Sequence, residues 1–441
     1  MEVFLIKAAQ LILSLSILVV LHEMGHFIPA KLFKTRVEKF YLFFDPWFSL
    51  FKKKIGDTEY GIGWLPLGGY VKISGMVDES MDKEQMAKPA EPWEFRSKPA
   101  WQRLIIMLGG VTVNLLLGII IYIMVLFVWG REYIPVQSAI YGVHCDSLMV
   151  ANGFMEGDRI IKVGTEIPET LSEVSKKIII NDQKEITVLR NGVEKKITLP
   201  ENIETQILDA GSKKRLFENR VPVVVDSIMA GGNAEKAGLL KGDKIITVNK
   251  DTAQYYVDFR KKLDLLKNEN IEIGVERKGE FIALNAAVKD DGTIGFGLLG
   301  EDKLFKVKVE KYSFLASIPA GYDFAISTLT GYVQSLKLLF TSSGAKQIGG
   351  FGSIGGMFAP VWNWQSFWEM TALISIILAF MNILPIPALD GGHVLFLIWE
   401  MITGRQANQK FMEYAQIAGM VLLLGLTLYG NGNDILRAIG R

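Results

Sequence analysis

The stretch that decides the fold is LSLSILVVLHEMGHFIPAKLF, residues 13–33, in which a nearly continuous apolar run ends in two histidines and a glutamate. The run from Val3 to Phe27 is long enough to cross a bilayer as a helix. Because no small-x-small cleavage site follows it, we expect an uncleaved membrane helix rather than a signal peptide. Ionisable side chains are costly in hydrocarbon, so three of them together indicate a functional site.

Three further apolar stretches follow along the chain. They cover residues 104–128, 367–389 and 415–430. The stretch 367–389 contains Pro385 and Pro387, which stop a regular helix before the next segment begins. The expected fold class is therefore a polytopic α-helical membrane protein with four transmembrane helices.

The distribution of basic residues predicts the orientation of these helices. Lysines and arginines concentrate in residues 31–103, between the first two spans, so this segment is expected in the cytoplasm and the N-terminus outside. Residues 131 to about 310 then lie outside as well. Residues 312–340 carry apolar positions at helical spacing beside a polar face, and we expect an amphipathic helix on the outer membrane surface.

Composition limits the function classes. A net charge of +1 indicates no nucleic-acid partner, and the single cysteine, Cys145, excludes an intrachain disulfide. With 49% hydrophobic and 22% charged residues, the chain must contact both the lipid bilayer and water.

The outer segment contains an internal repeat. GFMEGDRIIKV begins at Gly153 and GLLKGDKIITV at Gly238, and each copy is followed by a predicted hairpin, at 186–199 and 271–284. This pattern predicts two tandem α+β domains. The amino-acid sequence of the second copy resembles that of PDZ domains. The second copy is a candidate binding site for peptide C-termini; the alternative is a pair of spacer domains without a ligand.

The HEMGH motif predicts a metal site. On a helix, His22 and His26 lie on one face at positions i and i+4, so both imidazoles can bind one ion. Glu23 is displaced from that face and is placed to reach a water as a general base. Two histidines with a carboxylate and an open fourth position favour zinc. The alternative is a chance occurrence of a short motif.

The third ligand must come from elsewhere, and Asp390 is the strongest candidate. It follows the proline break, and Gly391 and Gly392 permit close backbone approach. If residues 312–340 do not cross the membrane, Asp390 and His22 reach the same depth, toward the cytoplasmic side. The alternative role for Asp390 is a cap on the next helix. His144 lies in the outer segment and is a poor candidate.

Residues 58–75 are unusually apolar for a cytoplasmic loop. We expect a membrane-associated β-hairpin that turns at Leu67-Gly68-Gly69. Its edge is expected to pair with an unwound substrate, with Gly68, Gly69, Tyr70 and Val71 as substrate-binding residues. The alternative is a hairpin that only packs over the helices.

Taken with the tandem insert, three motifs resemble the site-2 protease family and within it the bacterial regulator-of-sigma-E proteases. They are HEMGH (22–26), FRSKPAWQRLIIMLGGVTVN (95–114) and NILPIPALDGG (382–392). The resemblance covers nearly the whole chain in the same order. One departure precedes Asn114, where Gly110 is followed by Val111 instead of the family's usual proline.

The resemblance implies an intramembrane zinc metalloprotease of the bacterial inner membrane. It implies His22, His26 and Asp390 as ligands of one Zn²⁺ per chain, Glu23 as the catalytic base, and Asn382 near the substrate backbone. Substrates would be the transmembrane helices of membrane proteins, including anti-sigma factors after a first cut and remnant signal peptides. The outer domains would limit access to the site.

The expected organisation has five parts: 1–130 and 366–441 as the two halves of the membrane domain, 131–220 and 221–305 as PDZ-like domains, and 306–365 as an amphipathic helix and linker. Two competing functions stay open on the sequence. One is a membrane-anchored zinc protease that cuts soluble or misfolded proteins at the cytoplasmic face. The other is a non-catalytic membrane scaffold.

Overall fold

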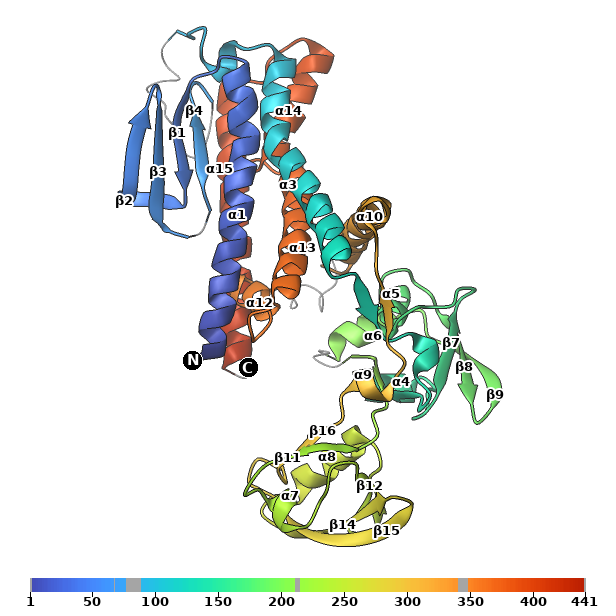
Figure 1. Cartoon of the computed structure of the whole chain (residues 1–441). Coiled ribbons are helices and arrows are strands. Elements are labelled where there is room, and N and C mark those ends of the chain that lie inside the picture. Colours follow the sequence, from blue (N-terminus) through green and yellow to red (C-terminus); the bar gives the residue numbers. More distant parts are fainter. Residues whose placement is uncertain (1, 67, 77–88, 211–214, 340–347, 440–441) are drawn as a thin grey trace. The chain divides into compact units, whose positions relative to one another are not determined.

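The computed structural model describes residues 2–66, 68–76, 89–210, 215–339 and 348–439. The chain divides into two compact units (Figure 1). One unit combines Met1–Gly130 with Lys311–Arg441, and the other is Arg131–Glu310. The N-terminal and C-terminal parts of the first unit therefore fold together, which allows His22 and Asp390 to share one site.

Among the described residues, four helices of the first unit are long and apolar enough to cross a membrane. They are α1 (Glu2–Leu32), α3 (Ala100–Val128), α13 (Trp364–Ile383) and most of α15 (Gln409–Ala438). The predicted number of spans is confirmed. The departure from the family's proline after Gly110 leaves α3 as one uninterrupted helix.

Helices α1 and α3 touch through their backbones. A methyl group at Gly109 would lie 1.9 Å from the carbonyl oxygen of Gly25. Small residues allow such close approach between helices in a membrane. The contact lies between His22 and His26 along α1, so it brings α3 against the face that carries both histidines.

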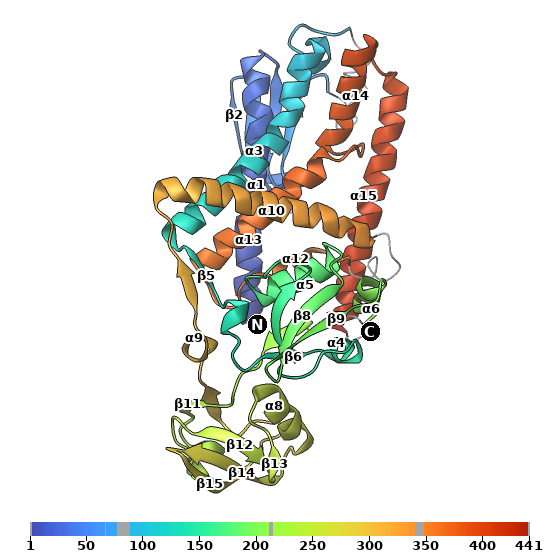
Figure 2. The same cartoon turned by 90° about the vertical axis from the view of Figure 1, so that its right-hand side faces the viewer.

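The described residues of this unit also contain the α-helices α10 (Phe314–Leu339), α12 (Phe351–Gly356) and α14 (Asp390–Thr403). Figure 2 shows α10 lying across α3 instead of along it. Within the part of the chain that the structure describes, α10 is not among the candidate spans, as expected. Its Ala325 is buried against Ile121 and Val125 of α3; the predicted helix residue Phe340 lies outside the described residues.

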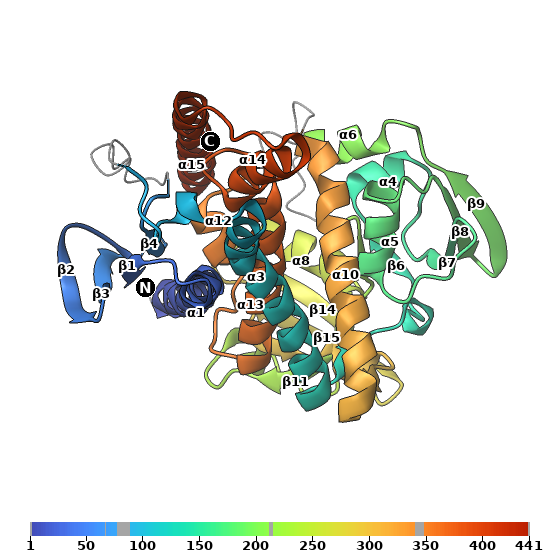
Figure 3. The ribbon, with the colours of Figure 1, turned by 90° about the horizontal axis from the view of Figure 1, so that it is seen from above.

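A four-stranded sheet packs beside α1, on the side away from α10 (Figure 3). Its strands are β1 (Val37–Leu42), β2 (Phe44–Ile55), β3 (Thr58–Leu65) and β4 (Tyr70–Ile73). Their order is β2-β3-β1-β4, with β1 parallel to β3 and antiparallel to β4.

This order corrects the hairpin predicted for residues 58–75. Strands β3 and β4 do not pair with each other, because β1 lies between them; the hairpin that does form joins β2 to β3. The predicted turn residue Leu67 lies outside the described residues. Alternation of apolar residues indicates strands but not which strands pair, and the partner β1 is distant in sequence. As a result β4 is an edge strand.

The second unit has two hydrophobic cores. The first core lies under the sheet β7-β8-β9 (Arg159–Val163, Glu185–Arg190, Val193–Thr198), the pair β6 and β10 (Val143–Cys145, Phe217–Asn219), and α4, α5 and α6 (Ser147–Ala151, Leu171–Ile179, Ile203–Asp209).

The second core lies under the sheet β13-β12-β14-β15 (Asp251–Thr252, Lys244–Val248, Asn270–Arg277, Glu280–Ala287), the pair β11 and β16 (Val225–Ile228, Phe296–Leu298), and α7 and α8 (Asn233–Lys236, Tyr256–Leu265). At the ends of the unit, β5 (Arg131–Tyr133) pairs with β17 (Lys308–Glu310), which follows α9 (Glu301–Leu304).

The sequence repeat recurs as one side-chain arrangement. In each copy an arginine at the end of a strand donates to both carboxylate oxygens of the aspartate in the Gly-Asp turn, and to a glycine carbonyl. The residues are Arg190, Asp158 and Gly153 in the first copy and Arg277, Asp243 and Gly238 in the second. The aspartates are almost completely buried, so these bonds hold the turn against its sheet.

Replacing Arg277 by methionine tests this arrangement. Burial opposes ionisation of Asp243, but hydrogen bonds from Arg277 and the Leu240 amide keep its pKa below the ordinary value. The pair therefore stabilises the fold above about pH 4, and this stability is lost as pH falls through the lowered pKa. We expect Arg277→Met to lower the free energy of unfolding at pH 7 by about 1.5–3 kcal/mol, because Arg277 is partly exposed and its hydrogen bonds to a charged group are lost.

The measurement is hydrogen exchange of the β14 amides in the full chain, between pH 7 and pH 3. Lys262→Met is the control, because its ion pair with Asp251 is largely exposed and contributes at most about 1 kcal/mol. Equal protection of β14 in both variants at pH 7 would show that the buried pair adds nothing.

Candidate metal centre

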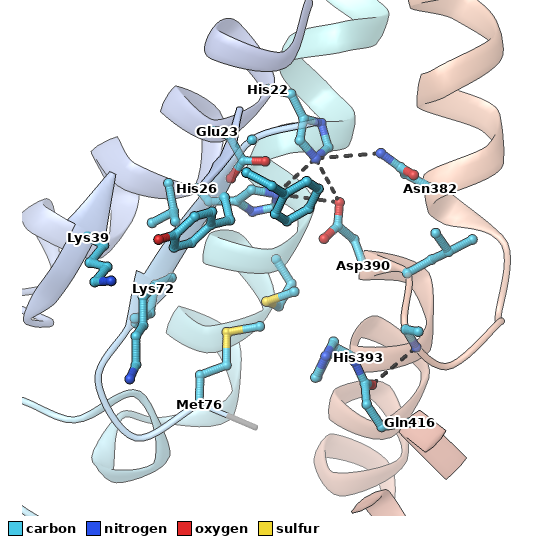
Figure 4. Close-up of a pocket in the computed structure, with 18 of the residues that line it drawn as sticks. His22, Glu23, His26, Lys39, Lys72, Met76, Asn382, Asp390, His393 and Gln416 are labelled. Carbon is cyan, nitrogen blue, oxygen red and sulfur yellow. Dashed lines mark hydrogen bonds and ion pairs between the residues drawn. The ribbon is translucent and has the colours of Figure 1, made fainter. Parts of the chain in front are cut away.

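Three side chains from two ends of the chain converge at one point (Figure 4). His22 and His26 come from α1, and Asp390 is the first residue of α14. The two Nε2 atoms lie 3.3 Å apart, and each lies 3.4 Å from Asp390 Oδ2. All three side chains are largely shielded from solvent. The structure thus brings together the three residues that the sequence analysis selected as ligands.

Helix α3 orients both imidazoles through contacts at their Nδ1 atoms. His26 Nδ1 lies 2.8 Å from the Ile106 carbonyl oxygen, so it carries the proton that it donates and leaves the Nε2 lone pair free. Asn114 Nδ2 lies 3.2 Å from His22 Nδ1. If the Asn114 side-chain amide is turned by 180°, its Oδ1 takes this place and accepts a hydrogen bond from the proton on His22 Nδ1. Both Nε2 lone pairs then face Asp390. Sequence analysis missed this role of α3, because the contacts join residues about 80 or more positions apart.

The three donor atoms fit a zinc ion. Ligand atoms about 2.0–2.1 Å from a tetrahedral zinc are roughly 3.3–3.4 Å from one another, which matches the observed separations. Asp390 Oδ2 is enclosed and accepts no hydrogen bond from any described residue, although buried carboxylate oxygens normally have a partner. A cation bound between the three donor atoms would be the missing partner of Asp390 Oδ2.

The turn at residues 384–389 places Asp390. Helix α13 ends at Ile383, and Pro385 and Pro387 lie in the turn, so the predicted break is confirmed. Leu389, not Asp390, is the N-cap of α14, and the structure gives no side-chain cap bond there. The alternative role of Asp390 as a helix cap therefore does not hold, and its carboxylate is free to face the histidines.

A cavity of about 720 Å³ opens beside the three ligands. Glu23 and Asn382 both line it, and Asn382 Nδ2 lies 3.5 Å from His22 Nε2. A methyl group at Gly69, the residue before β4, would lie 3.7 Å from Glu23 Cγ, so the chain that enters β4 passes beside the expected base. Both predicted catalytic residues thus line the cavity that contains the three donors.

The edge strand β4 forms a wall of this cavity. Gly69, Tyr70 and Val71 line it, as do Lys72 and Gln416, which sequence analysis did not select. Gly68 is not among the lining residues; it adopts a φ of +141° that favours glycine and lies against Phe44. His144, a poor ligand candidate from the sequence, lies in the second unit, where its Nδ1 is 2.7 Å from Glu156 Oε1.

Comparison with known proteins agrees with this geometry. Residues 10–426 match the model of peptidase family M50. The chain belongs to this family. A protein of Haemophilus influenzae named regulator of sigma E protease is 28% identical over 98% of this chain and 99% of its own length. A "Putative zinc metalloprotease" of Treponema pallidum is 26% identical over 98% and 99% of the two chains.

The chain is therefore a zinc metalloprotease and a multi-pass membrane protein with four candidate spans. Family membership implies zinc, and His22, His26 and Asp390 form a group of donors able to hold it. The non-catalytic scaffold considered for the sequence does not agree with this membership.

Gly110 provides a test of how tightly α3 closes on the protease's donor atoms. A methyl group there would lie 2.4 Å from His26 Nε2 and 2.6 Å from His22 Cε1, too close for the rings to keep their positions. We expect Gly110→Ala to weaken zinc binding at least about tenfold, as loss of ligand orientation does elsewhere. The affinity is measured by competition with a chelator in detergent.

Gly425→Ala on α15 is the matched control, since nothing lies within 4 Å of its added methyl group. It should bind zinc as the wild type does. Unchanged zinc affinity in Gly110→Ala would mean that the rings have more freedom than the structure indicates.

Proposed function

We propose that this protease hydrolyses peptide bonds in the transmembrane segments of other membrane proteins. The observation that carries the proposal is the origin of the donor atoms: two lie on the candidate span α1, and the third follows the end of the candidate span α13. His22 is about 20 residues into α1, or roughly 30 Å of helix. A site at that depth meets a substrate within or near the bilayer.

His22, His26 and Asp390 would hold one zinc ion. Bound zinc supplies Lewis acidity, which polarises a scissile carbonyl and makes water a nucleophile near neutral pH. Glu23, beside the ligands in the cavity, takes the proton of the attacking water and delivers it to the leaving amine. Asn382, which lines the same cavity, donates a hydrogen bond from its amide to the substrate backbone.

A transmembrane substrate must unwind to expose a carbonyl, and β4 offers a template for the extended form. One edge of β4 pairs with β1, and the strand itself lines the cavity beside Glu23. An edge strand presents unpaired backbone groups to which another chain can add. In this proposal Gly69, Tyr70 and Val71 contact the added strand, while Gly68 shapes the turn before them.

We further propose where the protein lies, how it is oriented in the membrane and which substrates it cleaves. The protein lies in the bacterial inner membrane with residues 31–103 cytoplasmic, and α10 lies on the outer surface. Residues 131–220 and 221–305 are PDZ-like domains outside, which admit trimmed substrates and, in the second copy, bind peptide C-termini. The two cores and the repeated arginine–aspartate arrangement support two domains of one kind. Anti-sigma-type proteins and remnant signal peptides are the proposed substrates.

Glu23→Gln tests the catalytic assignment. The amide cannot take a proton from water, so we expect cleavage of a model transmembrane substrate to fall about 10²–10⁴-fold while zinc content stays unchanged. Asp390→Ala should lose zinc as well as cleavage. The measurements are product formation in detergent or proteoliposomes and zinc content of the purified chain.

Glu369→Gln is the control, because it makes the same change on α13, where the side chain contacts Gln365. Cleavage of a soluble protein but not of a purely transmembrane substrate would instead favour the membrane-anchored protease that acts at the cytoplasmic face.

Methylating single backbone nitrogens of a substrate peptide tests the added strand without altering the enzyme. In a strand, alternate backbone groups face the same neighbour, so methylation at every second position should weaken binding at least about tenfold. Positions between these should bind normally, and apparent affinity from inhibition of cleavage reports the pattern. A uniform response along the peptide would argue against pairing with β4.

A further inference from the structure

The C-terminal helix α15 contacts the turn that precedes Asp390. Gln416 of α15 is only 5% exposed, although it lies in an apolar helix. Its Oε1 accepts a hydrogen bond of 3.1 Å from the backbone amide of Ala388 (Figure 4). A buried amide side chain is costly without a partner, and this bond supplies one. The bond lies two residues before Asp390.

A second contact lies almost one helical turn further along α15. A methyl group at Gly419 would lie 1.6 Å from the Pro387 carbonyl oxygen, so the helix backbone touches the turn directly. Residues i and i+3 share a helix face, so Gln416 and Gly419 act on the turn together. One side chain and one backbone contact thus hold two consecutive residues, Pro387 and Ala388.

The turn needs this support because its backbone is strained. Ala388 has a φ of +81°, a region that residues with a Cβ rarely adopt. Such a conformation persists only where the surrounding structure imposes it. The chain direction at Ala388 determines where Leu389 begins α14, and hence where the Asp390 carboxylate points.

The Asp390 carboxylate lies 3.4 Å from the Nε2 atoms of His22 and His26. Asp390 Oδ2 accepts no hydrogen bond from the described residues. Gly391 packs against the Leu384 carbonyl and Gly392 against Pro387, so these contacts hold the start of α14 from within the turn. Helix α3 packs against the later part of α14 through Val394 and Leu397, and α15 contacts the turn itself.

We propose that Gln416 is a positioning residue for the metal site: its bond to Ala388 holds the strained turn so that Asp390 faces His22 and His26. This inference rests on the proposed role of Asp390 as a metal ligand. Gln416 does not touch the donor atoms; it acts through the backbone. The C-terminal helix is therefore part of the metal centre's support.

The test uses the full chain in detergent, stripped of metal and titrated with Co²⁺. Four-coordinate Co²⁺ absorbs visible light more strongly than five- or six-coordinate Co²⁺, so the spectrum reports ligand geometry as well as affinity. Gln416→Leu removes the acceptor at similar size, and Gln416→Glu keeps an oxygen acceptor at the same reach. Thr427→Val is the control on α15, since among the described residues its hydroxyl bonds the Leu423 carbonyl of its own helix.

We expect Gln416→Leu to weaken Co²⁺ binding about 10–100-fold and to reduce the visible absorption, as loss of a supporting hydrogen bond does at other metal sites. Gln416→Glu should bind within about threefold of the wild type, and Thr427→Val should match it. Gly419→Ala provides an independent variant if Gln416→Leu does not fold, because its methyl group displaces Pro387 and should weaken binding in the same way.

Asp390→Ala separates the two proposals. If it binds Co²⁺ as tightly as the wild type, the ligand set itself is wrong. If Asp390→Ala loses Co²⁺ while Gln416→Leu binds normally, the ligand set stands and the positioning role of Gln416 is overturned. Equal losses in Gln416→Leu and Gln416→Glu would also overturn it, because the acceptor oxygen would then not matter.

Discussion

Two imidazole nitrogens and one carboxylate oxygen lie 3.3–3.4 Å from one another, with their lone pairs directed at a common point. Electron-rich atoms at this separation repel unless a proton or a cation lies between them. A metal ion removes the repulsion, and the surrounding structure is arranged to bring the three donors to the distance that zinc requires. The close glycine contact between α1 and α3 and the strained turn before α14 both serve this convergence.

The donors are supported from three directions. Helix α3 holds the rings of His22 and His26 through Asn114 and the Ile106 carbonyl. Helix α15 holds the turn before Asp390 through Gln416. Strand β4 passes beside Glu23 and forms a cavity wall. The proposed base Glu23 and two of the three donors come from α1, the third donor comes from α14, and the proposed substrate template is β4; all of them line one cavity.

The order of strands explains how β4, the proposed substrate template, comes to line the cavity. Had residues 58–75 formed the simple hairpin expected from their alternation, β4 would pair with β3. Insertion of β1 between them leaves β4 at the edge of the sheet, and Gly69 just before β4 lies against Val19 and Glu23 of α1. A strand beside the proposed base, with one edge that pairs with no other described strand, suits the binding of an extended peptide.

Features that depend on neighbouring residues could be predicted from the sequence alone. Apolar length predicts the four spans, the i, i+4 spacing places His22 and His26 on one face, and Pro385 and Pro387 end a helix wherever they occur. The meeting of Asp390 with His22, the support from Gln416 and the pairing partner of β4 were decided only by the tertiary structure. Each depends on residues far apart in the chain, whose approach is set by packing of whole helices and strands rather than by any local preference.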